Sequence, residues 1–365
     1  MLRLGIVGIG RIAEDYIELI ASGKVTDVHL AALCSRSAER AREVVKRYHL
    51  GASVYQDYDA FLRSGELDAV LICTPHGQHP RMTRQALERG IHVLVEKPVG
   101  IFADEVEEIL PLLRQDPALV CGVLYNRRAS KAFRYVKESV ERGAIGELVR
   151  CTWVLTNLYR THAYYTSGSW RGAWASEGGG LLMTQASHQL DLMQWLCGMP
   201  ISVRARCASV GRRIAVENEA ELFLTFPNGA HGQFIASAHE CPGSNLLELC
   251  GTKGKITVRD DMDVTEELLR VDERDFAKES PDPFEKPPFT RVTQHFDDSG
   301  NKVQQAATIQ NFVGAVNGRE SIQCTLEEGL HSLRIIHGAY LSDWEMRDIA
   351  LPAPETEFRR HLAVR

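Results

Sequence analysis

The feature that most constrains this chain is a pair of glycines placed directly after its first apolar run. Residues 2–7 form a short apolar segment, and Gly8-Ile9-Gly10-Arg11-Ile12-Ala13 follows at once. A Gly-x-Gly-x-x-Ala pattern between a strand and a helix is a dinucleotide fingerprint, because it gives a tight turn, room for a pyrophosphate and close helix–sheet packing. The start of the chain is therefore predicted to bind a dinucleotide. The predicted cofactor-binding residues of this motif are Gly8, Gly10, Arg11 and Ile12.

Strand-like and helix-like segments alternate through the first third of the chain. The apolar run of residues 69–73 is continuous, which is typical of a central parallel strand covered on both faces. Such alternation predicts a parallel sheet with right-handed crossovers, and ligands of such sheets bind at the carboxyl ends of the strands. The predicted strands are residues 2–7, 28–34, 69–73, 92–95 and 119–123, and the predicted helices include residues 38–48, 80–89 and 104–114.

The pattern changes near residue 124, where longer strand-like segments begin. Short turns between them, such as Pro227-Asn228-Gly229, indicate antiparallel pairing. The acidic, proline-rich residues 260–299 are predicted to be a solvated excursion, with a lid as the alternative. The predicted strands are residues 147–157, 201–210, 219–226, 232–238 and 246–250, and the predicted helices are residues 132–142, 309–316 and 327–344.

These patterns predict an α/β fold class with two domains. Residues 1–123 are expected to form an NAD(P)-binding Rossmann domain with a doubly wound parallel sheet. Residues 124–365 are expected to form an α+β domain for substrate binding and oligomerisation, with a large, mostly antiparallel open sheet.

Composition and charge exclude several classes of function. The net charge of −6 argues against a nucleic-acid partner, whose phosphates require a basic face. No apolar run approaches the ~20 residues of a membrane-spanning helix, and the amino-terminal segment does not read as a signal peptide. The nine cysteines form no Cys-x-x-Cys pair, so we expect free thiols and a cytoplasmic protein. His76 and His79 have no nearby carboxylate or cysteine cluster, and no metal site is predicted.

The end of the second predicted strand bears on which dinucleotide binds. An NAD enzyme usually has an acidic residue there to hold the ribose hydroxyls, whereas this chain has Cys34-Ser35-Arg36-Ser37. Ser35 can donate a hydrogen bond to a phosphate group, and the Arg36 guanidinium can bind a phosphate group through two parallel N–H···O hydrogen bonds. NADP is therefore the favoured cofactor. The alternative is that NAD binds and that Arg36 is solvated or stacks on adenine.

Further motifs follow the fingerprint in order along the chain. They are Cys73-Thr74-Pro75-His76-Gly77-Gln78-His79, Glu96-Lys97-Pro98, Tyr125-Asn126-Arg127-Arg128, Trp170-Arg171-Gly172 and the glycine run that begins at Gly178. Over nearly the whole chain these motifs resemble the glucose–fructose oxidoreductase / inositol dehydrogenase / rhizopine catabolism family, called Gfo/Idh/MocA. The resemblance implies a nicotinamide-dependent oxidoreductase. It also implies cofactor contacts by Thr74, Pro75, His79, Glu96, Lys97, Asn126, Trp170 and Arg171.

Lys97 is the first candidate catalytic residue. It comes just after a predicted parallel strand, and Pro98 keeps it out of a helical conformation. A lysine at the carboxyl end of that strand can polarise an alcohol or ketone oxygen. In the resembled family the lysine of this motif binds substrate and cofactor and assists catalysis. The alternative is an ordinary surface lysine.

His188 is the second candidate catalytic residue. It lies four residues after Thr184, so both are expected on one helical face. A histidine that titrates near neutral pH can take the hydroxyl proton during oxidation and return it during reduction, which is its family role. Many family members carry Asp where this chain has Thr184, and a threonine can hydrogen-bond substrate but cannot act as a base. Because Thr184 replaces the usual Asp, His188 is the predicted proton-transfer group, with Lys97 beside it. Asp191 is expected to orient this helix or to reach the site, with a structural role as the alternative.

Tyr164 and Arg171 join Lys97, Thr184 and His188 as predicted substrate-binding residues. A tyrosine suits a sugar ring because it offers an apolar face and a polar edge, with core packing as the alternative. We predict an NAD(P)-dependent dehydrogenase or reductase that transfers hydride between nicotinamide and a secondary alcohol or ketone of a sugar, polyol or cyclic diol. The alternatives are an NAD-dependent glycoside hydrolase, an aromatic dihydrodiol dehydrogenase and a non-enzymatic dinucleotide-binding regulator. The resemblance also implies a homodimer or homotetramer through the C-terminal sheet, without nucleic-acid or membrane partners.

Overall fold

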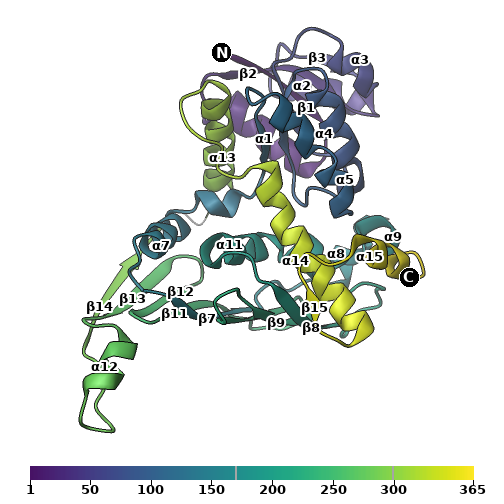
Figure 1. Cartoon of the computed structure of the whole chain (residues 1–365). Helices are drawn as coiled ribbons and strands as arrows, with labels where there is room; N and C mark the ends of the chain where they lie inside the picture. Colours follow the sequence, from purple (N-terminus) through teal and green to yellow (C-terminus); the bar gives the residue numbers. More distant parts are fainter. Residues whose placement is uncertain (169–170, 298–299) are drawn as a thin grey trace. The chain divides into compact units, whose positions relative to one another are not determined.

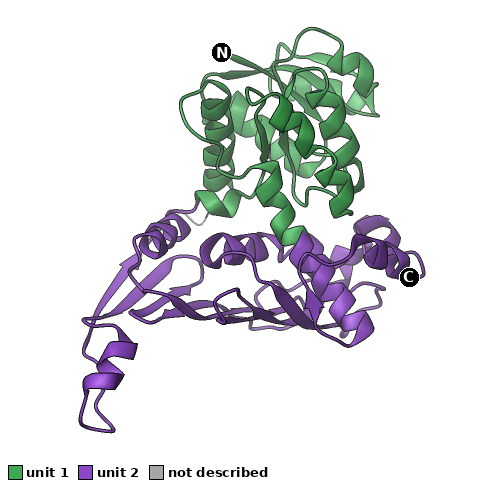
Figure 2. Cartoon of the chain, in the orientation of Figure 1, with its two compact units in different colours: residues 1–129, 300–333 green, residues 130–299, 334–365 purple. Residues whose placement is uncertain are grey.

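The computed structural model describes residues 1–168, 171–297 and 300–365, which form two compact units (Figure 2). Unit 1 comprises residues 1–129 and 300–333, and unit 2 comprises residues 130–299 and 334–365. This division differs from the predicted boundary, because helix α13 (Asn301–Val316) belongs to unit 1. Ile309, Phe312 and Val313 of α13 are buried in the same hydrophobic core as the first strand. Burial of this apolar face decides which unit the helix joins, and its place in the sequence does not.

Unit 1 is built on a parallel sheet of six strands in the order β3-β2-β1-β4-β5-β6 (Figure 1). The strand order reverses between β1 and β4, and ligands of such sheets bind beyond the carboxyl ends of the strands at that point. The parallel sheet confirms the predicted fold class of the first domain. The strands are β1 (Leu2–Val7), β2 (Val28–Cys34), β3 (Ser53–Tyr55), β4 (Ala69–Ile72), β5 (His92–Val95) and β6 (Cys121–Val123).

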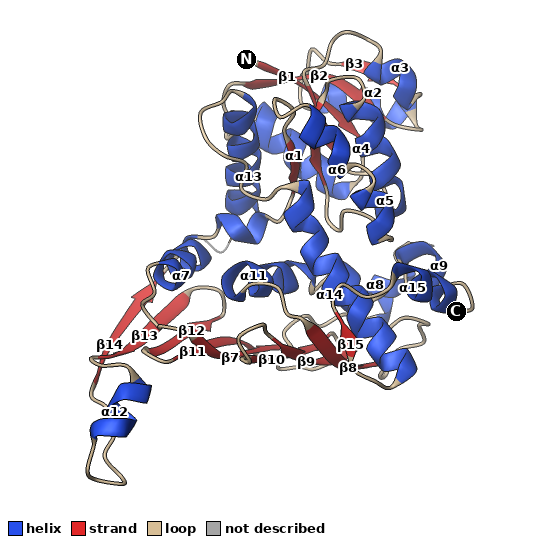
Figure 3. Cartoon of the chain, viewed as in Figure 1, coloured by secondary structure: helices blue, strands red, loops and turns tan. Residues whose placement is uncertain are grey.

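Helices cover this sheet and connect its strands (Figure 3). The predicted helix over residues 104–114 is divided in two, α5 and α6, because Pro111 cannot donate the backbone hydrogen bond that would continue the first helix. The helices of unit 1 are α1 (Arg11–Ala21), α2 (Ala38–Arg47), α3 (Tyr58–Leu62), α4 (His79–Leu87), α5 (Ala103–Glu107), α6 (Leu110–Gln115) and α13, with 3-10 turns η1 (His76–Gln78) and η2 (Asn126–Ala129).

Unit 2 contains a sheet of nine strands in the order β14-β13-β12-β11-β7-β10-β9-β8-β15. Only β7 and β10 pair in parallel, so the predicted mostly antiparallel sheet is confirmed. Helices α7 and α11 lie over one face of it (Figure 3). The strands are β7 (Leu148–Leu155), β8 (Ser202–Ala208), β9 (Glu219–Thr225), β10 (His231–Ser237), β11 (Asn245–Gly251), β12 (Gly254–Arg259), β13 (Asp263–Leu269), β14 (Phe289–His295) and β15 (Ile349–Ala350). The helices are α7 (Lys131–Glu141), α8 (His162–Thr166), α9 (Trp174–Glu177), α10 (Leu181–Thr184), α11 (Ser187–Cys197), α12 (Glu273–Glu279) and α15 (Glu355–Leu362), and α14 (Leu326–Glu345) contributes residues to both units.

The sequence predicts a solvated excursion over residues 260–299, and the described part of this segment is largely exposed but contributes two strands to the sheet. Strands β13 and β14 extend the sheet, and only the segment between them, with α12, projects beyond its edge (Figure 1). Val264 of β13 is buried, while the side chains of β14 are mostly exposed. Charged residues and prolines are depleted in strands, so this segment does not have a strand-like composition. An exposed edge strand also lacks a buried apolar face, so no apolar pattern in the sequence predicts it.

All nine cysteines are free thiols. Of the helices in the described ranges, none combines the length and the apolar character that crossing a membrane requires.

Candidate functional site

The turn after β1 explains why the first fingerprint position is a glycine. Gly8 has a φ of +88°, and a Cβ there would lie 2.8 Å from the carbonyl of Cys73 and from the backbone nitrogen of Thr74. The Gly8 N–H donates to the Cys34 carbonyl at 3.0 Å. The fingerprint turn is therefore packed against the loop that follows β4, and any side chain at Gly8 would separate the two.

The second fingerprint position, Gly10, adjoins open space. A Cβ on Gly10 would meet no heavy atom within 4 Å, although the glycine has an ordinary φ of −100°. Gly10 is the N-cap of α1, and no side chain caps this helix. The first amide groups of a helix lack intrahelical partners and carry partial positive charge, which suits an anion. Space and uncapped amides together fit the pyrophosphate of a dinucleotide.

Two arginines follow the end of β2, and only one of them forms an ion pair with a described residue. Arg40 pairs with Glu14 at 3.1 Å. Arg36 is exposed, and its guanidinium forms no ion pair with any described residue. Its backbone carbonyl accepts a bond from Gln56 at 3.2 Å, which fixes the main chain there. Ser35 Oγ accepts a bond from the Ser37 backbone nitrogen at 3.3 Å. Arg36 can therefore take a phosphate without breaking an existing salt bridge.

His79 joins two loops of the predicted cofactor site. Its Nδ1 lies 2.8 Å from the Pro98 carbonyl, and its Nε2 lies 2.7 Å from the Thr74 carbonyl. Burial lowers the pKa of His79 to about 4, while both carbonyls act in the opposite direction. Both ring nitrogens therefore face carbonyls of the protein itself, and His79 contacts the loop of Thr74 as well as the loop of Lys97. The sequence indicated a direct cofactor contact for it, and that contact stays a prediction.

Lys97 follows a glutamate that the fold holds in place. The Lys97 backbone N–H donates to Glu96 Oε2 at 3.0 Å, and the hydroxyl of Tyr16 on α1 donates to Glu96 Oε1. Burial raises the pKa of the Glu96 carboxyl, and the charge of Lys97 lowers it. Tyr16 is buried, and its spacing with Ile12 and Ile20 reads only as an apolar helix face. The sequence therefore gave no indication that Tyr16 orients the loop of Lys97.

The glycine run of unit 2 is explained by residues far away in the sequence. A Cβ on Gly179 would overlap the hydroxyl of Tyr340, and a Cβ on Gly180 would overlap the backbone carbonyl of Glu217. Both contacts are buried, so neither partner can move into solvent. The run is glycine because two other segments occupy the space of its side chains.

Glu217 anchors the start of α10. Its carboxylate accepts bonds from the backbone nitrogens of Gly180 at 2.8 Å and Leu182 at 2.9 Å, and from the Tyr340 hydroxyl at 2.8 Å. Burial raises the pKa of Glu217 to about 7, against the effect of these donors. Sequence reasoning missed Glu217, because nothing in its own segment indicates a partner almost 40 residues earlier.

Thr184 and His188 lie on two separate helices, which corrects the prediction of one continuous face. Thr184 ends α10, and α11 begins at Ser187. The Ala186 N–H donates to the Leu181 carbonyl at 2.8 Å, which widens the turn and interrupts the regular helical pattern. The Thr184 hydroxyl donates to the Gly180 carbonyl at 2.8 Å. Both candidate residues are partly exposed, as groups that meet a substrate must be.

Asp191 is fully buried and accepts a bond at 3.0 Å from Gln194 of the same helix. This contact agrees with the structural alternative predicted for Asp191.

Arg171 and Tyr164, two of the predicted substrate-binding residues, are in contact. The Arg171 guanidinium donates to the Tyr164 hydroxyl at 2.6 Å and lies 4.3 Å from the centre of its ring. Glu177, which the sequence did not indicate, accepts a bond from the Gly172 N–H at 2.6 Å and thereby fixes the loop of Arg171. Burial raises the pKa of Glu177 to about 7, and the Arg171 charge lowers it. Trp170, a predicted cofactor contact, lies outside the described residues.

The remaining predicted cofactor residues lie in unit 1. Arg11 and Ile12 open α1, Pro75 precedes the 3-10 turn η1, and Asn126 begins η2 and is buried. The structure brings the loops of Gly8, Thr74 and Lys97 together in unit 1, and brings Tyr164 to Arg171 in unit 2. The functional roles of these residues stay predictions.

Comparison with known proteins supplies independent findings. Residues 2–123 match the model of the oxidoreductase family with an NAD-binding Rossmann fold, and residues 133–257 match the GFO/IDH/MocA C-terminal domain. An uncharacterized oxidoreductase of Bacillus subtilis is 26% identical over 346 residues, 93% of each chain. The trans-1,2-dihydrobenzene-1,2-diol dehydrogenase of Bos taurus is 28% identical over 263 residues, 71% of this chain and 74% of the relative. The solved structure of a levoglucosan dehydrogenase in complex with NADH and levoglucosan has the same fold, with a TM-score of 0.80, 20% identity and coverage of 96% of this chain and 99% of that one.

Proposed function

The chain belongs to the Gfo/Idh/MocA oxidoreductase family, and from that premise we propose that it transfers hydride between NADP and a secondary alcohol or ketone of a sugar, polyol or cyclic diol. The observation that carries the proposal is the open space at Gly10 over the uncapped start of α1. Contacts from Gly8 through Thr74 and His79 connect that space to the loop of Lys97. The dihydrodiol and levoglucosan dehydrogenases among the relatives support this substrate class.

Residues of unit 1 are assigned to hold the cofactor. The amides at the start of α1 hold the pyrophosphate, with Gly10 leaving the room that it needs. Arg36 and Ser35 hold the 2′-phosphate of the adenosine ribose. When bound, the nicotinamide ring supplies the acceptor or donor of hydride.

Three side chains are assigned to the reacting oxygen. The Lys97 ammonium polarises the oxygen and stabilises charge that develops on it. The His188 imidazole takes the hydroxyl proton in oxidation and returns it in reduction. Because the Thr184 hydroxyl already donates to the Gly180 carbonyl, Thr184 serves as an acceptor toward a substrate hydroxyl.

Cofactor choice is tested by fluorescence titration of the protein with NADPH and NADH. Replacing Arg36 by Gln is expected to weaken NADPH binding by about tenfold or more and to leave NADH binding nearly unchanged, because only NADPH carries the phosphate that Arg36 clamps. Gly10→Ala serves as the contrast, since its Cβ fills the pyrophosphate space and should weaken both cofactors alike.

Tighter binding of NADH than NADPH by the unaltered protein would contradict the assignment of Arg36 and point to oxidative use of NAD. Binding of neither cofactor would remove the basis of the proposal and favour the non-enzymatic regulator. Cleavage of glycosides without net cofactor reduction would favour the glycoside hydrolase instead.

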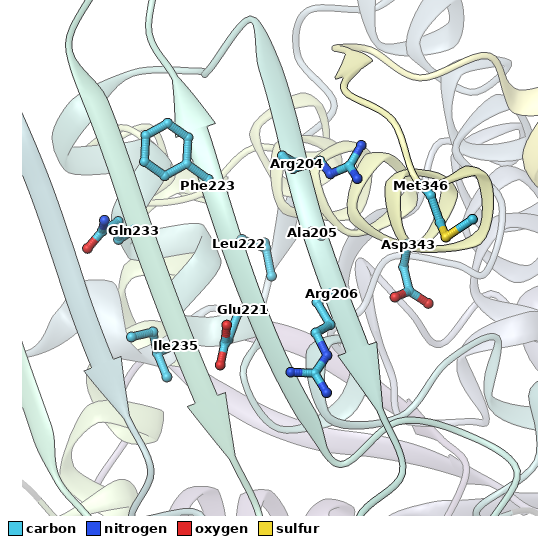
Figure 4. A pocket seen from close by; sticks show the side chains of 10 residues that line it. All are labelled: Arg204, Ala205, Arg206, Glu221, Leu222, Phe223, Gln233, Ile235, Asp343 and Met346. Atoms are coloured by element: carbon cyan, nitrogen blue, oxygen red, sulfur yellow. The ribbon is translucent and has the colours of Figure 1, made fainter.

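A homo-oligomer through the open face of the unit 2 sheet is part of the proposal. Across β7, β11, β12, β13 and β14 that face carries a ladder of ion pairs, formed by Arg150, Glu248, Lys255, Glu267 and Arg291. Across β8, β9 and β10 it carries a groove of about 640 Å³, in which apolar side chains lie among the charged residues Arg204, Arg206, Glu221 and Asp343 (Figure 4). Phe223 is 46% exposed there and Met346 is 78% exposed. Paired charges suit solvent, whereas exposed apolar side chains favour burial against a second copy.

Light scattering tests this expectation. The unaltered protein should have a mass that is a multiple of 40.8 kDa, and Phe223→Glu should shift it toward 40.8 kDa by placing a charge in the contact. A concentration-independent mass near 40.8 kDa for the unaltered protein would show the expectation to be wrong. The cytoplasmic location stays a prediction.

A further inference from the structure

Three arginines gather on three loops of unit 2. We call Arg160, Arg171 and Arg212 the arginine cluster. Arg160 lies in the loop after β7, Arg212 lies in the loop between β8 and β9, and Arg171 lies in the loop that precedes α9. Arg212 Nε donates to the Arg160 carbonyl at 2.9 Å, which ties the first two loops together.

Aromatic rings hold the guanidinium groups of the cluster. Those of Arg160 and Arg171 lie 5.2 Å and 4.3 Å from the centre of the same ring, that of Tyr164. Arg212 lies 5.5 Å from the ring of Tyr159. Stacking on one ring holds the guanidinium groups of Arg160 and Arg171 in place beside Tyr164.

Carboxylates do not neutralise Arg160 or Arg212. Neither forms an ion pair with a described residue, and Arg160 donates to the backbone carbonyls of Leu158 at 3.2 Å and Tyr159 at 2.8 Å. The buried carboxylate of Glu177 accepts a bond from the Gly172 N–H, and that of Glu217 accepts one from the Gly180 N–H. Some arginines of unit 2 are paired, as Arg150 is with Glu248 at 3.1 Å and Arg274 with Glu147 at 2.6 Å.

The cluster adjoins the predicted substrate residues. The Ala215 N–H donates to the Gly172 carbonyl at 2.9 Å, so the loop of Arg212 pairs with the loop of Arg171. Two residues after Ala215, Glu217 holds the start of α10, which ends at Thr184. Burial raises the pKa of Tyr165, while Arg212 and Arg160 lower it, which agrees with their closeness to this ring.

We infer that the arginine cluster binds an anionic group of the substrate, a carboxylate or a phosphate. Aromatic rings and backbone carbonyls already hold these guanidinium groups in position. They therefore lose little conformational entropy when they form bidentate hydrogen bonds to such an anion. The inference rests on the proposed function, and it narrows the substrate from a neutral sugar, polyol or diol to an acidic one.

Isothermal titration of the full-length protein with three related probes tests the inference. The probes are D-glucuronate, D-glucose 6-phosphate and neutral D-glucose, each measured with and without NADPH. At least one anionic probe should bind about tenfold or more tightly than glucose. The double variant Arg160→Gln/Arg212→Gln should lose that advantage by a similar factor and leave glucose binding unchanged. Glutamine keeps a donor for the backbone carbonyls, so the loops remain supported.

Arg213→Gln is the matched control, because Arg213 is exposed on the same loop and makes none of the cluster's contacts. It should leave all three affinities unchanged. Preference for glucuronate identifies a carboxylate site, and preference for glucose 6-phosphate identifies a phosphate site. Equal affinity for the three probes, or an anion preference that survives in the double variant, overturns the inference. Failure to bind NADPH while the anion preference persists would instead overturn the proposed function.

Discussion

Replacing Lys97 by Met, or His188 by Ala, is expected to lower kcat by at least about a hundredfold, which is the usual size of a lost acid–base or charge-stabilising group. Methionine keeps most of the length of Lys97 but removes the charge that polarises the oxygen. Alanine removes the group that moves the proton, and Thr184 cannot replace it because a hydroxyl is not a base near neutral pH.

The measurement is the change in NADPH absorbance with a panel of sugars, polyols and cyclic diols, made on the unaltered protein and both variants. Cofactor titration should show that His188→Ala binds NADPH with an affinity within about twofold of that of the unaltered protein. A lower kcat in this variant then does not result from misfolding. Lys46→Met and His29→Ala, both at exposed positions, are the matched controls and should keep full turnover. Near-normal turnover in both active-site variants would remove Lys97 and His188 from the catalytic assignment.

Replacing Gly180 by Ala is expected to destabilise unit 2 by about 3 kcal/mol or more, at the upper end of what overpacking costs. The added Cβ would overlap the carbonyl of Glu217 and approach its carboxylate, both of which are buried. A backbone carbonyl cannot rotate away as a side chain can. The variant must therefore move α10 away from Glu217, and the bonds from Gly180 and Leu182 to that carboxylate are lost with it.

Urea unfolding followed by tryptophan fluorescence measures this effect directly. All five tryptophans lie between residues 153 and 344, in the segments assigned to unit 2, so their emission reports on that unit. Gly51→Ala is the control, because its Cβ would meet nothing within 4 Å and should change stability by about 0.5 kcal/mol or less. A Gly180→Ala transition that coincides with that of the unaltered protein would mean that Glu217 does not anchor α10.

The sequence indicated the parts of the site that are built from contiguous residues. The fingerprint at Gly8 and Gly10 and the loop of Lys97 each depend on residues beside them, which is why a local pattern predicts them. A tight turn or an extended segment of this kind requires particular residue types at adjacent positions. The alternation of strands and helices likewise follows from local periodicity and predicted both sheets.

Tertiary structure alone decided which distant residues support those parts. The hydroxyl of Tyr340 accepts a hydrogen bond from the N–H of Gly180, which lies 160 residues earlier. No sequence pattern around either residue predicts this contact. The same holds for Glu217 below α10, for Tyr16 at Glu96, and for the arginine cluster, whose members come from three loops. Helix α13 joins unit 1 for a comparable reason, since its apolar face finds its partner only after the chain has passed through unit 2. Local sequence determined most of the strands and helices of unit 1 and the glycine turn after β1, because those depend on near neighbours. Packing and the satisfaction of buried polar groups determined how these elements are held, because those depend on residues that meet only in the folded chain.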